Sequence, residues 1–213
     1  MSGISIIGTG NMARILGGMA LAGGSTVEII GRDADKAADL ASELGGGATT
    51  AKIGDVPAGD IVILAVLYAG AAPVISQYGD ALAGKVIVDI TNPADPAGFT
   101  GLVTPADSSA AQEIAQAAPA GAHVVKAFNT LFGHVLTARR PGDRPLDVFI
   151  AGDDAEAKGR VSAFVESLAL RPLDTGDLKM AHWLEGAALL MIRLAIGQAV
   201  KTSDFALGIS VLD

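Results

Sequence analysis

The stretch IIGTGNMA, residues Ile6–Ala13, decides the fold. Gly8, Gly10 and Ala13 form a G-x-G-x-x-A pattern between a short apolar run and a segment of helical character. In a dinucleotide-binding turn the first glycine permits a tight turn and the second lets a pyrophosphate approach the backbone. The small third residue keeps the helix close to the sheet. Because the pattern lies between an expected strand and an expected helix, it predicts such a turn at the start of a βαβ unit. An ordinary glycine turn is the alternative.

The rest of the chain continues this alternation of short apolar runs and Ala-rich segments, with Gly or Pro at most joints. The expected strands cover residues 4–7, 26–30, 48–51, 61–66, 86–90, 123–127, 147–151 and 170–174. The expected helices cover residues 12–22, 34–44, 71–78, 109–117 and 178–200, with others between the last strands. Strands that alternate with helices pair in parallel through right-handed crossovers. We therefore predict an α/β fold with a doubly wound (Rossmann), mostly parallel sheet.

A polar stretch near residues 139–145, rich in Pro and Gly, suggests a division of the chain. We expect a dinucleotide-binding Rossmann domain at residues 1–140 and a small C-terminal α/β extension at residues 141–213 that ends in an apolar helix. The helix expected at residues 178–200 is apolar on nearly every face, more than a surface helix needs. We expect it to form a wall of the substrate pocket and the seam of a homodimer.

The overall composition excludes several classes of function. The chain has 213 residues, a formal net charge of −8 and no cysteine. The acidic balance argues against nucleic acid or an anionic membrane as a partner, and the charges within residues 178–200 argue against a membrane span. The absence of cysteine excludes thiol catalysis and disulfides and fits a reducing cytoplasm. No grouping of His, Asp and Glu has metal-ligand spacing, so we predict a cytoplasmic protein without a metal.

The residues after the second expected strand indicate which dinucleotide binds. A site that prefers NAD usually has Asp or Glu at this strand end, to bind the ribose 2′-hydroxyl. This chain has Gly31 there, followed by Arg32 and, one helical turn later, Lys36. A guanidinium fork and an ammonium suit a 2′-phosphate, and the hydroxyl of Thr9 is a further contact. These residues favour NADP over NAD. The alternative is that both cations are surface charges paired with the aspartates beside them.

Five motifs, in this order along the chain, resemble the NADPH-dependent coenzyme F420 reductases, also called F420H₂:NADP oxidoreductases. They are GTGNMA (residues 8–13), GRDADKA (31–37), DIVILAV (60–66), KVIVDITNP (85–93) and LRPLDTGDL (170–178). The same resemblance extends to the cytosolic NADPH-binding domain of the six-transmembrane metalloreductases. It covers nearly the whole chain, and it implies an NADP-dependent oxidoreductase on a Rossmann fold.

The resemblance also implies roles for residues at four strand ends. The pyrophosphate would lie on the first turn and the 2′-phosphate at the second, with the nicotinamide at the fourth, fifth and sixth strand ends, where ligands bind in this fold. The implied cofactor-binding residues are Gly8, Thr9, Gly10, Asn11, Met12, Gly31, Arg32, Lys36, Ala65, Val66, Leu67, Thr91, Asn92, Pro93 and Ala127. The implied substrate pocket contains Tyr68, Phe128, Asn129 and His134.

One departure from the family pattern concerns the second substrate. The deazaflavin reductases tend to carry an aromatic–acid–His sequence after the fourth strand, whereas this chain has Tyr68-Ala69-Gly70. The stretch VVKAFNT, residues 124–130, looks closer to the metalloreductase domain. The resemblance thus implies hydride transfer between NADP(H) and coenzyme F420, with two alternatives. One is a soluble NADPH:flavin (FMN or FAD) or ferric reductase, and the other is a non-catalytic NADPH-binding sensor.

Hydride transfer between two stacked rings requires positioning and exclusion of water more than acid–base chemistry. The residues expected around the crevice, which are mainly Ala, Leu, Val, Phe and Pro, fit this requirement. We therefore assign no catalytic acid, base or nucleophile.

Overall fold

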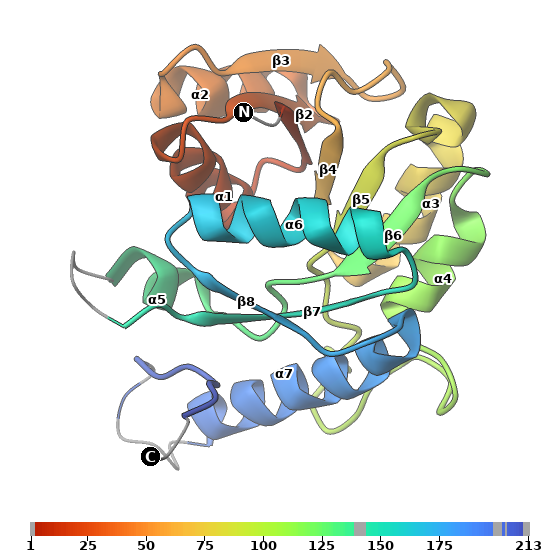
Figure 1. Ribbon diagram of the computed structural model, residues 1–213, viewed down its shortest axis with the longest axis vertical. Coiled ribbons are helices and arrows are strands. Elements are labelled where there is room, and N and C mark those ends of the chain that lie inside the picture. The colour runs from red at the N-terminus through yellow and green to blue at the C-terminus, as the bar shows by residue number, and fades with distance from the viewer. Residues whose placement is uncertain (1–2, 139–143, 198–201, 203, 211–213) are drawn as a thin grey trace.

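The computed structural model describes residues 3–138, 144–197, 202 and 204–210. Its eight strands form one sheet in the order β3-β2-β1-β4-β5-β6-β7-β8 (Figure 1). The strands are β1 (Gly3–Ile7), β2 (Thr26–Gly31), β3 (Thr49–Lys52), β4 (Ile61–Leu64), β5 (Val86–Asp89), β6 (His123–Lys126), β7 (Asp147–Gly152) and β8 (Arg171–Asp174). Neighbouring strands pair in parallel except β6 and β7. The predicted mostly parallel Rossmann sheet is confirmed.

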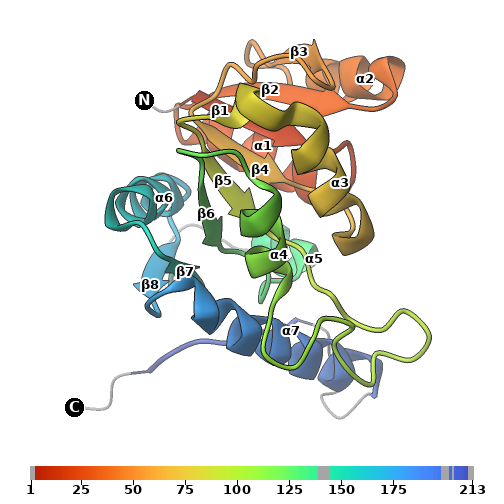
Figure 2. The ribbon, with the colours of Figure 1, turned by 90° about the vertical axis from the view of Figure 1, so that its right-hand side faces the viewer.

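Helices cover both faces of this sheet. They are α1 (Asn11–Ala22), α2 (Ala34–Leu44), α3 (Tyr68–Tyr78), α4 (Ala110–Ala117), α5 (Gly133–Ala138), α6 (Ala155–Ser167) and α7 (Ala181–Ile196), with the short 3₁₀ helices η1 (Gly79–Leu82) and η2 (Leu178–Met180). One buried cluster joins α1, α2 and α6 to one face, and a second joins α3 and α4 to the other. Figure 2 shows α6 and the α3–α4 pair on opposite sides of the sheet.

The central strands are continuous apolar runs because both of their faces are covered. In β4 and β5 every residue is buried, and alternate residues belong to the two clusters. The predicted positions of the strands agree with the structure to within two residues at each end. The helix that begins at Tyr68 is three residues longer at its start than the prediction.

Strands β7 and β8 extend the sheet beyond the carboxyl ends of the central strands. Only two pairs of residues join β6 to β7, Val125 with Gly152 and Lys126 with Ala151. This antiparallel register places the start of β7 past the end of β6, so that β7, β8 and α7 lie below the edge where ligands bind in this fold (Figure 1). The C-terminal part of the chain therefore faces the carboxyl edge of the dinucleotide-binding sheet.

The predicted division between residues 140 and 141 lies in residues 139–143, outside the described residues, and stays a prediction. The apolar segment expected at residues 178–200 forms η2 and then α7, and residues 198–200 are likewise outside the described residues. Within the described ranges, no helix has the length and hydropathy needed to cross a bilayer. The expected cytoplasmic location stays a prediction.

Candidate functional site

The glycine turn after β1 is held in a conformation that a side chain would disrupt. Gly8 has a φ of +131°, and its N–H donates to the carbonyl of Ile30 at 2.8 Å. A Cβ at this position would lie 2.1 Å from the carbonyl oxygen of Ala65. Gly8 is therefore required by the close approach of three strand ends, as the sequence pattern predicts. Ala13, in the first turn of α1, is fully buried, which fits its predicted role in packing this helix against the sheet.

The N-terminus of α1 is open to an anion. Its N-cap is Gly10, which has no side chain to accept from the first backbone N–H groups, and the first turn carries no acidic residue. By contrast, α2, α4 and α6 are capped by the side chains of Asp33, Ser109 and Asp154. A Cβ built on Gly10 would meet nothing within 4 Å, so packing within the chain does not require a glycine there. Free N–H groups at a helix N-terminus bind phosphates well, and this turn fits a pyrophosphate.

The end of β2 presents a cation beside a space that cannot hold an acid. A Cβ on Gly31 would lie 2.8 Å from Cγ2 of Thr9, so an Asp or Glu at this position would displace that side chain. Arg32 is exposed, and it forms no ion pair or hydrogen bond with any described residue. Lys36 lies 3.6 Å from Oδ2 of Asp33, and both side chains are more than half exposed. The alternative of paired surface charges thus applies to Lys36 and not to Arg32.

A cavity of about 1020 Å³ joins the glycine turn after β1 to the end of β2. Its lining comes from the carboxyl ends of β1, β2 and β4 and from α3. Eight of the predicted cofactor-binding residues line it: Gly8, Thr9, Gly31, Arg32, Lys36, Ala65, Val66 and Leu67. We call this cavity the outer end of the crevice.

The loops after β5 and β6 contact each other deeper along the carboxyl edge. The side-chain Nδ2 of Asn92 donates to the backbone carbonyl of Asn129 at 2.9 Å. The side-chain Nδ2 of Asn129 donates to Oδ1 of Asn92 at 3.1 Å and to the backbone carbonyl of Leu184 in α7 at 2.9 Å. Among the described residues, the buried Oγ1 of Thr91 and Oδ1 of Asn129 have no hydrogen-bond partner. We call the loops 91–93 and 127–129 the inner end of the crevice.

A buried ionic cluster below these loops was not predicted from the sequence. The Lys126 side chain is fully buried, and its ammonium donates to Oδ2 of Asp89 at 2.8 Å, to the carbonyl of Thr91 at 2.6 Å and to Oε1 of Glu185 at 2.8 Å. Asp89 and Glu185 have no exposed surface either. Burial raises the pKa of the Glu185 carboxyl, against the opposing effect of the Lys126 ammonium. Glu185 also accepts from the backbone N–H of Ala110 at 3.1 Å, at the start of α4.

Of the four residues predicted for the substrate pocket, Asn129 belongs to the inner end, and the other three lie in different surroundings. The hydroxyl of Tyr68 donates a hydrogen bond to Glu113 in α4 at 2.7 Å. Burial is the larger cause and this hydrogen bond the second cause that together raise the pKa of Tyr68 to about 12. Phe128 has a φ of +61° and buries its ring edge-on against Phe164 of α6. His134 stacks on Phe132, about half exposed, beside the N-terminal half of α1. None of the three lines the cavity at the outer end.

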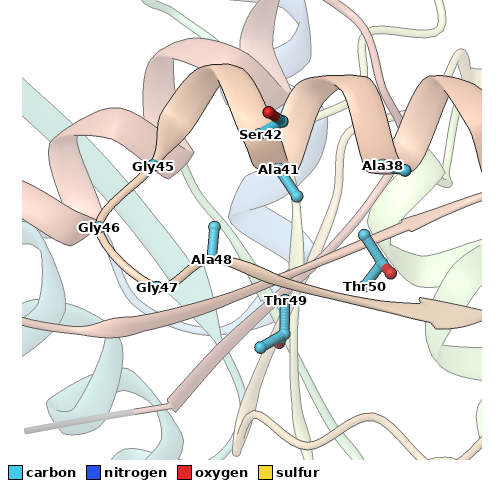
Figure 3. A pocket seen from close by; sticks show the side chains of 9 residues that line it. All are labelled: Ala38, Ala41, Ser42, Gly45, Gly46, Gly47, Ala48, Thr49 and Thr50. Carbon is cyan, nitrogen blue, oxygen red and sulfur yellow. The ribbon is translucent and has the colours of Figure 1, made fainter.

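A separate hollow of about 570 Å³ lies between α2 and β3, where three glycines form the turn (Figure 3). Its lining is Ala38, Ala41, Ser42, Gly45, Gly46, Gly47, Ala48, Thr49 and Thr50. It contains no charged or titratable side chain and no residue predicted to bind a ligand, so we assign it no role. Within the part of the chain that the structure describes, no group of three His, Cys, Asp or Glu residues is arranged to hold a metal ion.

Comparison with known proteins gives one match to a family and several to individual proteins. Residues 3–93 match the family described as NADP oxidoreductase, coenzyme F420-dependent. Metalloreductase STEAP3 of Rattus norvegicus is 31% identical over 189 residues, which are 89% of this chain and 37% of that protein. The F420-dependent NADP reductase of Methanocaldococcus jannaschii is 33% identical over 144 residues, which are 65% of this chain and 63% of that enzyme. The chain thus spans less than two thirds of the length of either relative.

Solved structures extend the similarity over the whole chain. A protein from Arthrobacter sp. FB24, assigned as an F420-dependent NADP reductase, has a TM-score of 0.85 at 27% identity and covers 98% of this chain and 99% of its own. A hypothetical protein from Sinorhizobium meliloti has a TM-score of 0.75 at 29% identity, covering 84% of this chain and 86% of its own. These matches confirm the resemblance stated from the sequence motifs.

Proposed function

Because the chain is related to the F420-dependent NADP oxidoreductases, we propose that it transfers a hydride between NADP(H) and the deazaflavin coenzyme F420. The observation that carries the cofactor is the outer end of the crevice. There, one cavity of about 1020 Å³ is lined by Gly8 and Thr9, which lead into the uncapped N-terminus of α1, and by Arg32, which has no partner among the described residues. The proposal that coenzyme F420 is the second substrate rests on the description of the matched family.

The outer end favours NADP over NAD for a steric and an electrostatic reason. A Cβ at position 31 would lie 2.8 Å from Cγ2 of Thr9, so an acidic residue, the usual partner of a ribose 2′-hydroxyl, would require Thr9 to move. Arg32, the next residue, offers a planar fork of donors that suits a phosphate. Lys36 adds a second positive charge once it is drawn away from its exposed contact with Asp33.

In the proposed reaction the chain binds, orients and excludes water. When bound, NADPH supplies the hydride from its nicotinamide ring. The turn at Gly8–Met12 holds the pyrophosphate, and Ala65, Val66 and Leu67 offer apolar surface to the ring. The inner loops close the crevice from the side of α7. Tyr68 keeps its hydroxyl proton, since its pKa lies far above neutral pH and Glu113 accepts its hydrogen bond. The expected contribution of the protein is therefore positioning.

A second candidate is an NADPH:flavin reductase that passes electrons to free FMN or FAD and onward to ferric iron. It is favoured by the 31% identity to a metalloreductase over 89% of this chain and by the absence of the acid and the imidazole after Tyr68. The two candidates share the NADPH site and differ in the acceptor alone.

Turnover with three acceptors separates the candidates. Purified protein is mixed with NADPH, and its oxidation is followed with coenzyme F420, FMN or FAD in turn. We expect multiple turnovers with F420 and little with either flavin. Turnover with a flavin alone would replace the first candidate with the second. Tight binding of NADPH without turnover on any acceptor would mean that the protein is a sensor.

We further propose that α7 pairs with α7 of a second copy. Trp183 and Leu190, seven residues apart, are 67% and 60% exposed on the outer face of this helix, while Leu184 and Glu185 are buried. Sedimentation velocity checks this proposal. Trp183→Ser with Leu190→Ser should convert a dimer to a monomer, and a wild-type protein that sediments as a monomer would contradict it.

A further inference from the structure

The buried cluster of Lys126, Asp89 and Glu185 connects distant parts of the chain at one point. Asp89 ends β5 and Lys126 ends β6, and the two residues are partners in the parallel register of these strands. Glu185 comes from α7 and also accepts from the N–H groups of Ala110 and Ala111 at the start of α4. Lys126 thus joins two central strands to two helices.

The fourth partner of the cluster is the backbone of the inner loop. Lys126 donates to the carbonyl of Thr91 at 2.6 Å, and Asp89 accepts from the N–H of the same residue at 2.8 Å. Both polar groups of the Thr91 backbone are therefore held by the cluster. The next residue, Asn92, exchanges hydrogen bonds with Asn129, whose amide also donates to Leu184, adjacent to Glu185. Through these contacts, α7 holds both loops of the inner end.

Stability alone does not account for a lysine at this place. Burying an ammonium and two carboxylates costs several kcal/mol per ion, and similar buried triads are often replaced by apolar residues without loss of stability. Apolar side chains would fill the same volume, yet they would leave the Thr91 carbonyl without its donor. Lys126 differs from an apolar side chain in that its three short hydrogen bonds have fixed directions. They hold the Thr91 carbonyl in one place relative to β5, β6 and α7.

We propose that Lys126 is a positioning residue for the nicotinamide end of the cofactor, acting through the Thr91–Pro93 loop with Glu185 as its anchor on α7. This inference rests on the proposed function, since it assigns the inner loops to the nicotinamide. The phosphate-binding residues of the outer end are on other strand ends and do not contact the cluster. Loss of Lys126 should therefore alter the placement of the ring and leave phosphate binding nearly unchanged.

The primary variant is Lys126→Met, which keeps an unbranched side chain one atom shorter and removes its donors. It leaves two buried carboxylates without their cation, which is strongly destabilising, so the triple variant Asp89→Asn, Lys126→Met, Glu185→Gln is made in parallel. It carries no charge in the cluster, and neutral replacement of a buried triad is usually tolerated. The matched control is Lys158→Met. Lys158 also donates to an aspartate and a backbone carbonyl, Asp174 at 3.0 Å and Gly176 at 3.1 Å, away from the crevice.

Two measurements are made on each folded variant. The first is the rate of hydride transfer to the active acceptor in a single turnover, together with Kd for NADPH. The second is the fluorescence of bound NADPH, which reports the surroundings of the nicotinamide and requires no acceptor. We expect Kd to change less than about threefold. The transfer rate should fall by roughly 100-fold, the scale associated with about 1 Å of misplacement, and the fluorescence should approach that of free NADPH. Lys158→Met should match the wild type in all three.

The outcomes separate this inference from the proposed function. A folded triple variant with wild-type transfer rate and fluorescence overturns the positioning role. Equal losses in Kd and rate also overturn it, since they indicate a general structural defect. A wild-type protein that transfers no hydride to any acceptor overturns the proposed function. In that case, a changed fluorescence in the variant still supports the placement of the ring by Lys126, and an unchanged one refutes it.

Discussion

The two ends of the crevice are built in opposite ways. The phosphate-binding part of the outer end consists of residues close in sequence, Gly8–Met12 and Gly31–Lys36, and its cations are exposed to solvent. The inner end is fixed by Lys126, Asp89 and Glu185, which are far apart in sequence and have no exposed surface. The outer end presents free donors and exposed charges, whereas at the inner end the charges are buried in ion pairs and the Thr91 backbone is held by hydrogen bonds.

This difference matches two separate tasks. A phosphate is recognised by unpaired cations and free N–H groups, which must be accessible before the ligand arrives. A ring that exchanges a hydride needs a fixed place more than it needs charge, and buried hydrogen bonds of fixed direction supply this rigidity. Binding strength should therefore depend mainly on the outer end, and the rate of transfer on the inner end.

The largest expected effect is that of Gly8→Ala, which breaks the outer end. The new methyl group would lie 2.1 Å from the Ala65 carbonyl oxygen in a backbone conformation with a φ of +131°. We expect a loss of at least about 3 kcal/mol in the free energy of unfolding, because the clash is with backbone atoms held in the sheet hydrogen bonds, which cannot yield at low cost. Urea denaturation measures it. The control is Gly10→Ala, whose methyl group meets open space. It should leave stability within about 1 kcal/mol and weaken NADPH binding, and a stable Gly8→Ala protein would contradict the geometry of the turn.

A smaller effect is expected from converting the outer end to one that binds the ribose 2′-hydroxyl of NADH. Gly31→Asp alone would clash with Cγ2 of Thr9, so the variant also carries Thr9→Gly. We expect weaker binding of NADPH by roughly 2 kcal/mol, since a carboxylate near the 2′-phosphate is repulsive, together with stronger binding of NADH. Titration of both cofactors checks the reversal. If the double variant kept the wild-type preference, the 2′-phosphate would lie elsewhere.

The smallest effect is expected far from both ends, at Asp147. Hydrogen bonding to Arg171 at 2.6 Å lowers the pKa of the Asp147 carboxyl, and the N–H of Ile209 also donates to it. Because this pKa is lower in the folded than in the unfolded chain, the pair stabilises the fold above about pH 4. That contribution disappears as the pH falls through the folded pKa.

The variant Asp147→Asn should thus be less stable than the wild type by about 1.5 kcal/mol at neutral pH, the low end of the scale for a hydrogen bond to a charged group. The difference should shrink below about pH 4, where thermal unfolding at several pH values would detect it. Binding of NADPH should be unchanged, so a variant with altered binding would show that the two ends of the crevice are not the whole site.

Sequence patterns predicted the outer end because its physics is local. A tight turn, a strand end and the first turn of a helix each depend on residues within a few positions, as in Gly8–Ala13 and Gly31–Lys36. The doubly wound sheet followed from the alternation of strands and helices for the same reason. Two neighbours in the fold, β4 and β5, could be recognised as buried because every residue in them is apolar or ends the strand.

The inner end could not be predicted in this way. Lys126 is 37 positions from Asp89 and 59 positions from Glu185, and only the folded chain shows that α7 returns to the carboxyl edge. One signal was present, since Asp89 and Lys126 each interrupt an apolar strand at its last residue. The antiparallel pairing of β7 with β6 could not be predicted either, because it depends on how two separate segments meet and not on a local pattern.

Binding of NADPH and NADH to the wild type and to Arg32→Ala tests the division between the two ends most directly. Isothermal titration calorimetry would give the four dissociation constants, one for each cofactor with each protein. We expect Arg32→Ala to weaken NADPH by about 1.5–3 kcal/mol, the usual scale for a hydrogen bond to a charged group, and to leave NADH nearly unchanged. An equal loss for both cofactors would contradict the account, since Arg32 would then act on a part of the cofactor that NADPH and NADH share.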